Sequence, residues 1–269
     1  MKYPTRIDEK SRFLKRQELV SYDLTMREYI ENGYMIIRDF FNVETIKNCL
    51  QYTGEKIGMD IKEPIGSEIR SKTSIHYNYP FRSLVDNEKL IKIVSGILGG
   101  GYYIHQSRVN YKKAFAGTGW SWHSDFETWH SQDGMPEMRC LSAMIPLTEN
   151  NLCNGSLMVV PKSHHYFWGS PKGKNMGAEN EFADQKEGVP DINALKRFFK
   201  NSKGEVILLT CKPGDLILFD CNLLHVSNPN LTSKDRTNLF FVFNSIENQL
   251  INPKRPEEMG ATKFEMIYI

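Results

Sequence analysis

The feature that most constrains the fold is a change of pattern close to Gly101. Beyond it the chain carries short runs rich in β-branched and aromatic residues, separated by turn residues. Lys212-Pro213-Gly214-Asp215 is a strong tight-turn signal between two of these runs. Many short strands of this kind favour a β-sandwich or barrel. The predicted strands are Tyr102–Tyr111, Arg139–Leu147, Leu157–Pro161, Glu205–Thr210, Leu216–Asp220 and Leu239–Ser245.

Before Gly101 the signals are mainly helical. Thr25-Met26-Arg27-Glu28 has the form of a capping box and Gly33 is a stop signal, so a helix is expected over Met26–Asn32, followed by a strand at Tyr34–Arg38. Residues 60–85 show no clear period. Two more helices are predicted, one capped by Asn42 with apolar Val43, Ile46, Cys49 and Leu50, and one over Leu90–Leu98 that ends at Gly99-Gly100-Gly101.

These signals predict one domain, 1–269, that is mainly β with flanking helices, an α+β arrangement. Residues 1–100 are expected to form a mostly helical support, and residues 101–269 the strand core. Within that core, residues 169–188 lack any period and are expected to form a surface loop. A helix capped by Asp191 is expected to follow and to end at Lys200.

Composition limits the classes of partner. The chain has 269 residues, enough to bury a core, and 34 basic against 32 acidic residues, too even a balance to indicate nucleic-acid binding. The five cysteines show no CxxC pair, and no apolar run approaches the roughly 18 residues of a membrane span. We therefore expect reduced thiols in a soluble, cytoplasmic protein that binds neither nucleic acid nor membrane.

One segment carries the strongest chemical signal, the tryptophan-rich run Trp120–Trp129. In a strand, residues two apart point to the same face, so His123 and Asp125 are predicted to reach one cation. His225, just after a predicted strand, is the best candidate for a third ligand. Two histidines and one carboxylate leave other coordination positions open, which suits non-haem Fe(II).

Arg236 decides between this interpretation and a simpler one. A His-x-Asp triplet arises often by chance, and a histidine beside tryptophan is commonly a packed core residue. A hairpin after His225 would bring Arg236 next to the metal, where its guanidinium could hold a carboxylate through two hydrogen bonds. A His–Asp pair, a distant histidine and then an arginine is the layout of a 2-oxoglutarate oxygenase.

The strand Tyr102–Tyr111 has an unusual polar face. Period-2 alternation places Gln106, Arg108 and Asn110 on one side, and His105 with Tyr103, Ser107 and Val109 on the other. The polar side is either exposed to solvent, the commoner case, or the wall of a pocket. With Trp129 and Phe240, such a wall would suit a small ligand that carries a carboxylate and a delocalised cation.

The remaining histidines carry weaker signals. His164 and His165 follow Pro161-Lys162-Ser163 at a strand end, and we interpret them as a structural turn rather than a ligand pair. His76 and His130 have no carboxylate at a convincing ligand spacing.

Two motifs make the chain similar to a known family. The run from Trp122 to His130, followed by Asp133-Gly134-Met135-Pro136, and the run from His105 to Lys112 resemble the ectoine hydroxylases of the phytanoyl-CoA dioxygenase superfamily. The resemblance extends over nearly the whole chain. Further similar segments are Tyr3–Arg6, Glu63-Pro64, Glu68–Ser71, Pro146–Gly155 and Arg236–Phe240.

The resemblance implies a double-stranded β-helix, or jelly-roll, core with Fe(II) held by His123, Asp125 and His225. It implies that 2-oxoglutarate and O₂ are co-substrates, and that ectoine, a compatible solute, is hydroxylated while succinate and CO₂ are released. The residues implied for 2-oxoglutarate are Asn110, Trp120, Ser227 and Arg236. Those implied for the substrate are Gln106, Arg108, Phe126, Thr128, Trp129, Phe219, Asn238 and Phe240.

Some departures from the family pattern leave the substrate open. Asn154-Gly155-Ser156 and Pro161-Lys162-Ser163 stand where Asn-Gly-Pro and Pro-Gly-Ser are usual, and residues 169–188 differ as well. One alternative is a related hydroxylase of another small solute, such as proline. Others are a cupin-like metal isomerase or hydrolase and a non-catalytic binder, against which Arg236 and the intact ligand set argue. A homodimer is one assembly that the sequence allows.

Overall fold

The computed structural model describes residues 5–6, 24–55, 57–63, 68–168, 189–190, 192–202, 204–257, 259–261 and 267. The predicted loop 169–188 and the predicted cap Asp191 lie outside these residues, and helix α6 is seen over Ile192–Ser202. Among the described residues, no helix is long and apolar enough to cross a membrane.

The largest sheet has seven antiparallel strands in the order β2-β11-β7-β13-β5-β4-β3. Its centre is the long pair β5 and β13, which extends from Arg236↔Lys112 to Ser245↔Tyr102 with one shift of register between Val242 and Phe243. The strand bounds are β2 (Tyr34–Ile37), β3 (Asp60–Lys62), β4 (Ile69–Thr73), β5 (Tyr102–Lys112), β7 (Cys140–Pro146), β11 (Leu216–Asp220) and β13 (Arg236–Ser245).

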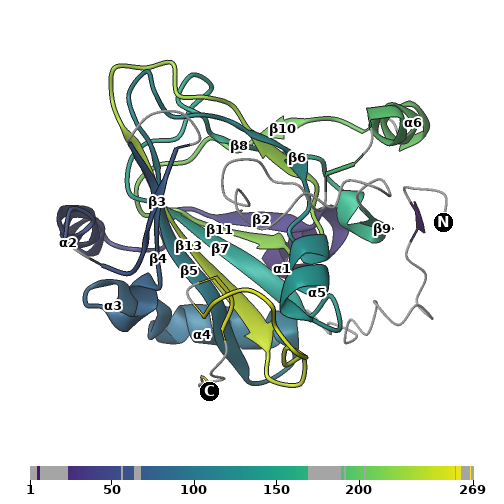
Figure 1. The fold of residues 1–269 in the computed structure, drawn as a ribbon, viewed down its shortest axis with the longest axis horizontal. Helices are drawn as coiled ribbons and strands as arrows, with labels where there is room; N and C mark the ends of the chain where they lie inside the picture. Colours follow the sequence, from purple (N-terminus) through teal and green to yellow (C-terminus); the bar gives the residue numbers. More distant parts are fainter. Residues whose placement is uncertain are drawn as a thin grey trace.

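A second sheet of four strands, in the order β10-β8-β12-β6, faces the first (Figure 1). Side chains from both sheets line one cavity between them. Two antiparallel sheets packed face to face in this way form the predicted jelly-roll core. The bounds are β6 (Trp120–His123), β8 (Leu157–Val159), β10 (Ile207–Leu208) and β12 (His225–Ser227), and a separate short pair joins β1 (Thr5–Arg6) to β9 (Tyr166–Phe167).

Four helices cover the face of the large sheet that points away from the cavity. They pack apolar side chains such as Tyr29, Ile46, Phe81 and Leu90 against Leu239 and its neighbours in one buried cluster. In Figure 1 α3 and α4 lie below the large sheet, and the strands β6, β8 and β10 lie above it. The helices are α1 (Leu24–Asn32), α2 (Val43–Tyr52), α3 (Phe81–Val85) and α4 (Glu88–Leu98).

The capping signals correctly predicted α2 and α4. Asn42 Oδ1 accepts a hydrogen bond from the Thr45 amide at 2.8 Å, which satisfies one of the free N–H groups of the first turn of α2. Gly99 ends α4 with φ of 74°, a left-handed conformation that glycine adopts without a steric penalty. The strands predicted beyond Gly101 are all present, although β8 and β10 are shorter than expected.

The division at residue 100 is wrong as a boundary between a helical support and a strand core. The strands β2, β3 and β4 all come from the first hundred residues and occupy both edges of the large sheet. We did not predict β3 and β4 because polar side chains replace apolar alternation there. In β4, Ser71 Oγ donates to Asn110 Oδ1 at 2.7 Å and Arg70 lies 4.0 Å from Glu63, so polar groups are buried with partners.

A β-bulge corrects the predicted faces of β5. Opposite Val242 and Phe243 of β13 the register steps from Gln106 to Ile104, which leaves His105 as the extra residue. The bulge reverses the alternation, so His105 does not share a face with Val109. His105 instead lies on the cavity side of the sheet, where its ring is 5.4 Å from the ring of Trp129.

Candidate functional site

The cavity between the two sheets holds about 710 Å³ of empty space, part of which is open to solvent. It brings together residues that are far apart in the chain. Of the predicted site residues, those that line it are Arg108, Asn110, Trp120, His123, Asp125, Trp129, Phe219, His225, Ser227, Arg236, Asn238 and Phe240.

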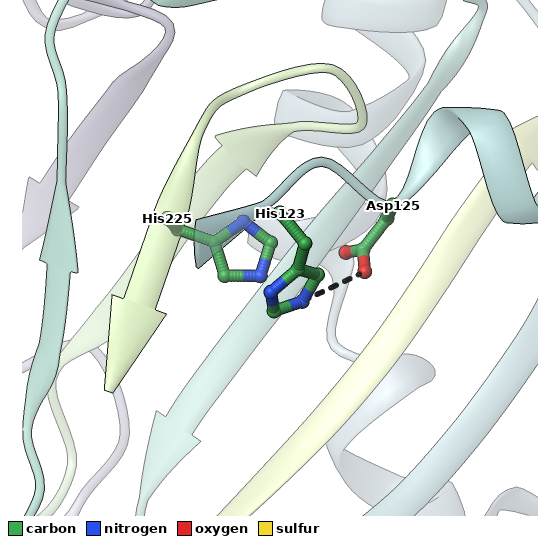
Figure 2. Close-up of side chains that lie close together, drawn as sticks. All are labelled: His123, Asp125 and His225. Carbon is green, nitrogen blue, oxygen red and sulfur yellow. Dashed lines mark ion pairs between the residues drawn. The ribbon is translucent and has the colours of Figure 1, made fainter. Parts of the chain in front are cut away.

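Three of these residues form a cluster with the donor set of a metal site. His123 is the last residue of β6, and His225, the first residue of β12, lies directly opposite it in the ladder. The ligand atoms of His123, Asp125 and His225 all lie within 4.8 Å of one another (Figure 2). Two imidazoles and one carboxylate on one side of a site leave positions open for other ligands, as in non-haem iron centres.

Backbone carbonyl groups set the orientation of both imidazoles. His123 Nδ1 is 2.7 Å from the Ser121 carbonyl oxygen, and His225 Nδ1 is 2.9 Å from that of Leu223. A carbonyl can only accept, so each Nδ1 carries the proton and each Nε2 is free to bind a metal. Burial, and then the electrostatic interaction with His225, holds the pKa of His123 well below its usual range, which favours the neutral, ligating form.

Asp125 reaches the cluster by a different route from the one predicted. It is not part of a strand, because β6 ends at His123 and Asp125 has helical φ and ψ of −76° and −31°. It immediately precedes helix α5 (Phe126–Asp133), which we did not predict. The turn between strand and helix, rather than strand alternation, therefore brings the carboxylate to His123, whose Nε2 is 3.6 Å from Asp125 Oδ1.

The predicted hairpin after His225 is also wrong. Strand β12 belongs to the small sheet and β13 to the large one, so the chain crosses between sheets before Arg236. Arg236 nevertheless lines the same cavity as His225, from the opposite side.

The guanidinium of Arg236 is buried without a carboxylate partner among the described residues. Its side chain belongs to a residue only 4% exposed, its Nη2 donates to the Gly155 carbonyl at 3.2 Å, and its Nε has no hydrogen-bond partner. Burial lowers the pKa of Arg236 to about 9. A buried, uncompensated cation of this kind is stabilised by a bound anion, and the guanidinium fork matches a carboxylate.

Two neighbours of Arg236 are held by residues of the N-terminal strands. Ser71 of β4 donates to Asn110 Oδ1, and the guanidinium carbon of Arg70 lies 3.6 Å from the centre of the Trp120 ring. The strands that were missing from the prediction thus support this end of the cavity.

Arg108 of β5 also lines the cavity, from the same sheet as Arg236 but farther along the pair β5 and β13. Its Nη2 donates to Gln106 Oε1, and burial lowers its pKa. Gln106 is only 4% exposed, so the interpretation of this strand face as solvent-exposed is wrong and that of a pocket wall is supported. The aromatic side chains of Trp129 and Phe240 line the same cavity.

Three predicted substrate residues do not line the cavity. Gln106 lies behind Arg108, Phe126 is fully buried in a cluster with Met135 and Met138, and Thr128 is on α5 away from the lining. Five lining residues were missed; four of them are on strands that are buried on both faces and show no alternation, and Gly155 lies in the loop before β8. They are Ser142, Met144, Gly155, Leu157 and Val242.

The other histidines have structural partners, as expected. His164 lies in a short 3₁₀ turn, Ser163–His165, with Nε2 3.1 Å from the Ile30 carbonyl oxygen. His130 Nδ1 is 2.7 Å from the Met135 carbonyl oxygen, and His76 Nδ1 is 2.6 Å from Ser107 Oγ.

Comparison with known proteins agrees with this geometry. The sequence model of the phytanoyl-CoA dioxygenase (PhyH) family matches residues 29–238, most of the chain. The chain belongs to the phytanoyl-CoA dioxygenase family. Among curated members, this dioxygenase is 41% identical to the ectoine dioxygenase of Halomonas elongata over 82% of this chain and 69% of the relative. It is 36% identical to that of Stutzerimonas stutzeri over 93% of this chain and 89% of the relative.

Solved structures show the same relationship for this phytanoyl-CoA dioxygenase. EctD from S. alaskensis, crystallised with 2-oxoglutarate and 5-hydroxyectoine, superposes with a TM-score of 0.80 at 32% identity, over 97% of this chain and 91% of EctD. Another structure of EctD contains bound iron. The carbocyclase SnoK, at 18% identity and a TM-score of 0.63, shares the fold.

Proposed function

We propose that the protein is an Fe(II)- and 2-oxoglutarate-dependent dioxygenase that hydroxylates ectoine to 5-hydroxyectoine. One observation carries the proposal: the cluster His123–Asp125–His225 lines the same cavity as the guanidinium of Arg236, which has no carboxylate partner among the described residues. The chain that holds them is 35–42% identical to eight ectoine dioxygenases.

The donor set fits iron. His123 and His225 would bind through Nε2, because Nδ1 of each faces a carbonyl, and Asp125 would supply the carboxylate. Bound iron supplies the activation of O₂ that couples oxidative decarboxylation of 2-oxoglutarate, to succinate and CO₂, to hydroxylation of a C–H bond. The chain contributes the fixed geometry of its three ligands and a cavity that restricts access of water.

The end of the cavity near Arg236 fits 2-oxoglutarate. A carboxylate that accepts from the Arg236 fork would compensate the buried charge and give Nε a partner. Asn110, Trp120 and Ser227 line the cavity with it and would contact the rest of the molecule. Arg236 would thereby fix 2-oxoglutarate relative to the three metal ligands.

The wall of Arg108, Trp129 and Phe240 fits ectoine, a small ring that carries a carboxylate and a delocalised amidinium. Arg108 has no carboxylate partner among the described residues and would hold that of the substrate. The faces of Trp129 and Phe240 would attract the amidinium and exclude water from the reacting carbon. Phe219 and Asn238, also in the lining, would complete the pocket, and Gln106 would support Arg108.

The substrate is tested by succinate release with Fe(II) and 2-oxoglutarate across ectoine, 5-hydroxyectoine, proline and related solutes. We expect ectoine to give the fastest release, with one hydroxylated product for each succinate. If succinate release with proline is as fast as with ectoine or faster, the assignment of ectoine as the substrate is wrong, whereas the iron- and 2-oxoglutarate-dependent reaction still stands. No 2-oxoglutarate turnover with any solute would favour a metal isomerase, a hydrolase or a non-catalytic binder.

Assembly and location stay predictions. The homodimer rests on no observation of this structure, and a cytoplasmic enzyme that binds no nucleic acid is consistent with the weak net charge of +2. Sedimentation of the full chain would determine the assembly.

A further inference from the structure

A segment near the C-terminus lies against the substrate side of the cavity and is not used by the mechanism above. We call residues 255–257 and 259–261 the C-terminal strap. Its path follows β5 and the end of α5: the Ala261 amide donates to the His105 carbonyl at 2.9 Å, and just before the strap the Lys254 amide donates to the Gln132 carbonyl at 2.8 Å. The strap is therefore hydrogen-bonded to β5, and the residue that precedes it is hydrogen-bonded to α5.

The first link from the strap runs to Arg108. The Met259 carbonyl accepts from Gln106 Nε2, and Gln106 Oε1 accepts from Arg108 Nη2. A carbonyl and a guanidinium allow only this orientation of the amide between them. Gln106 thus holds the guanidinium of Arg108 in one direction relative to the backbone of the strap.

The second link runs to Trp129. Arg255 donates two hydrogen bonds to the carboxylate of Asp133, the last residue of α5. One comes from Nε, at 2.6 Å, and the other from Nη2. Asp133 is fully buried, and its Oδ2 lies 3.1 Å from Nε2 of His105. The ring of His105 packs edge-on against that of Trp129 at 5.4 Å.

The charges of the second link agree with its geometry. Burial lowers the pKa of His105 and keeps its ring neutral. Burial would raise the pKa of Asp133, but hydrogen bonds from Arg255 and His105 hold it below its usual range. The carboxylate is thus ionised and is neutralised by Arg255.

The strap also lies close to the groups of the second link. An added Cβ on Gly260 would be 3.1 Å from both the Asp133 carboxylate and the His105 ring. Contacts of that length are tighter than ordinary packing, so a side chain at position 260 would press against these groups, and glycine lets the strap lie directly beside them.

We propose that the C-terminal strap determines substrate recognition by positioning Arg108 and Trp129, with Arg255 acting through Asp133 as a positioning residue. The identity of the ligand in this inference rests on the proposed function. Both links end on side chains that line the cavity, whereas neither reaches Arg236 at the 2-oxoglutarate end. The strap should therefore affect the substrate and leave the co-substrate alone.

The test compares Arg255→Lys, which keeps the charge but loses the fork, with Asp133→Asn and the double variant. The matched control is Lys254→Gln, because Lys254 is an exposed neighbour whose Nζ donates to the Ser131 carbonyl at 3.1 Å and forms no ion pair with a described residue. We expect each single variant to raise the KM for ectoine about tenfold and to uncouple 2-oxoglutarate turnover from hydroxylation. The KM for 2-oxoglutarate should stay within twofold.

The double variant tests the route through Asp133. If Arg255 acts through Asp133, the double variant should be no worse than the poorer single variant, within twofold. Additive effects would show that Arg255 acts on the substrate directly and would overturn the route. Equal rises in both KM values would mean a general loss of structure and would overturn the proposal.

A measurement without substrate separates this inference from the proposed function. The indole N–H signal of Trp129, assigned with Trp129→Phe, should shift in ¹⁵N spectra of Arg255→Lys and Asp133→Asn but not of Lys254→Gln. An unchanged signal in folded variants would overturn the strap's role, even for an enzyme that hydroxylates ectoine. Absence of ectoine turnover in the wild type would contradict only the assignment of ectoine as the substrate.

Discussion

At the scale of single residues, two guanidinium groups divide the cavity into two ends. Arg236 and Arg108 both line it, neither has a carboxylate partner among the described residues, and burial lowers the pKa of each. A buried cation without an anionic partner costs stability, and a ligand carboxylate removes that cost. Two such groups match two carboxylate ligands, 2-oxoglutarate and the substrate, bound on either side of the metal ligands.

Substitution of each arginine should therefore affect a different ligand. Arg236→Lys keeps the charge but loses the fork, so binding of 2-oxoglutarate should weaken by about 1–3 kcal/mol and its KM should rise roughly 5- to 150-fold. Arg108→Ala should weaken ectoine turnover and spare 2-oxoglutarate decarboxylation in the absence of substrate. Steady-state kinetics with each ligand varied will show which of the two KM values each variant changes. The control is Arg82→Lys, because Arg82 is in an exposed ion pair with Asp86.

An unchanged requirement for 2-oxoglutarate in Arg236→Lys would place the carboxylate site elsewhere. Parallel loss of thermal stability and of both reactions in Arg108→Ala would make Arg108 a structural residue.

The three metal ligands are expected to act as a unit. His123→Ala, Asp125→Ala and His225→Ala should each abolish Fe(II) binding and turnover, because two ligands cannot hold the ion in its open geometry. Equilibrium dialysis of Fe(II) without oxygen measures binding. His165→Asn, an exposed histidine away from the cavity, should bind iron as the wild type does. Full activity in any of the three alanine variants would contradict the assignment.

At the scale of elements, the loop that begins β8 brings the small sheet against the large one. Gly155 has φ of 77°, and an added Cβ would lie 2.4 Å from the Asn228 carbonyl oxygen and 2.5 Å from Cδ of Lys112. Its own carbonyl accepts from Arg236. Only glycine allows this close approach, so the Arg236 end of the cavity depends on a residue without a side chain.

Gly155→Ala should therefore destabilise the fold by at least about 1 kcal/mol and raise the KM for 2-oxoglutarate. Gly54→Ala is the matched control, since its added Cβ meets nothing within 4 Å, and it should change stability by less than about 0.5 kcal/mol. Urea unfolding and kinetics of both variants provide the comparison. Equal stability of the two variants would show that the loop relaxes without cost.

A second prediction concerns the 3₁₀ turn Ile75–Tyr77, which follows β4. His76 Nδ1 contacts Ser107 Oγ, and burial, then the charge of Arg82, lowers the pKa of His76 to about 4. The unfolded chain, with a pKa near 6.5, binds the proton more tightly. The stabilisation from His76 is thus complete above pH 6.5 and is lost as the pH falls toward 4, by at most about 3 kcal/mol.

His76→Asn should lose less stability than the wild type over that pH range, because it has no proton to gain. Chemical unfolding at several pH values between 4 and 7 measures the difference, with His165→Asn as the control. The same pH slope in wild type and His76→Asn would contradict the assignment of this titration to His76.

At the scale of the whole molecule, both halves of the chain build one sheet. The strands β2, β3 and β4 pair with strands that come after Gly101, and α1 to α4 cover the outer face of that sheet. Removing them would expose the apolar side chains of Leu239, Phe241 and Phe243, which are fully buried. Large exposed apolar surface drives aggregation rather than folding.

Residues 101–269 alone should therefore not form a stable, soluble core. We expect the fragment to lack a cooperative thermal transition in circular dichroism and to aggregate in gel filtration, whereas the full chain unfolds cooperatively in the same buffer. A fragment that is monomeric and melts cooperatively would restore the original division of the chain at residue 100.

Local pattern was sufficient for most elements and for the chemistry of the site. The caps of α2 and α4 lie within a few residues of the helices they start or end, so sequence alone identifies them. The histidines, the aspartate and Arg236 were identified as a set by their residue types and by family motifs. Those properties do not depend on which strands become neighbours.

Tertiary structure decided the features whose cause lies far away in the chain. β4 is a strand because its polar side chains find partners in other segments, and the bulge at His105 reverses the alternation on which the predicted faces of β5 depended. Asp125 meets His225 because the chain turns into α5, and Arg236 meets both because the chain changes sheets. Periodicity reports only on near neighbours, whereas burying a polar group depends on the partner that the whole fold supplies.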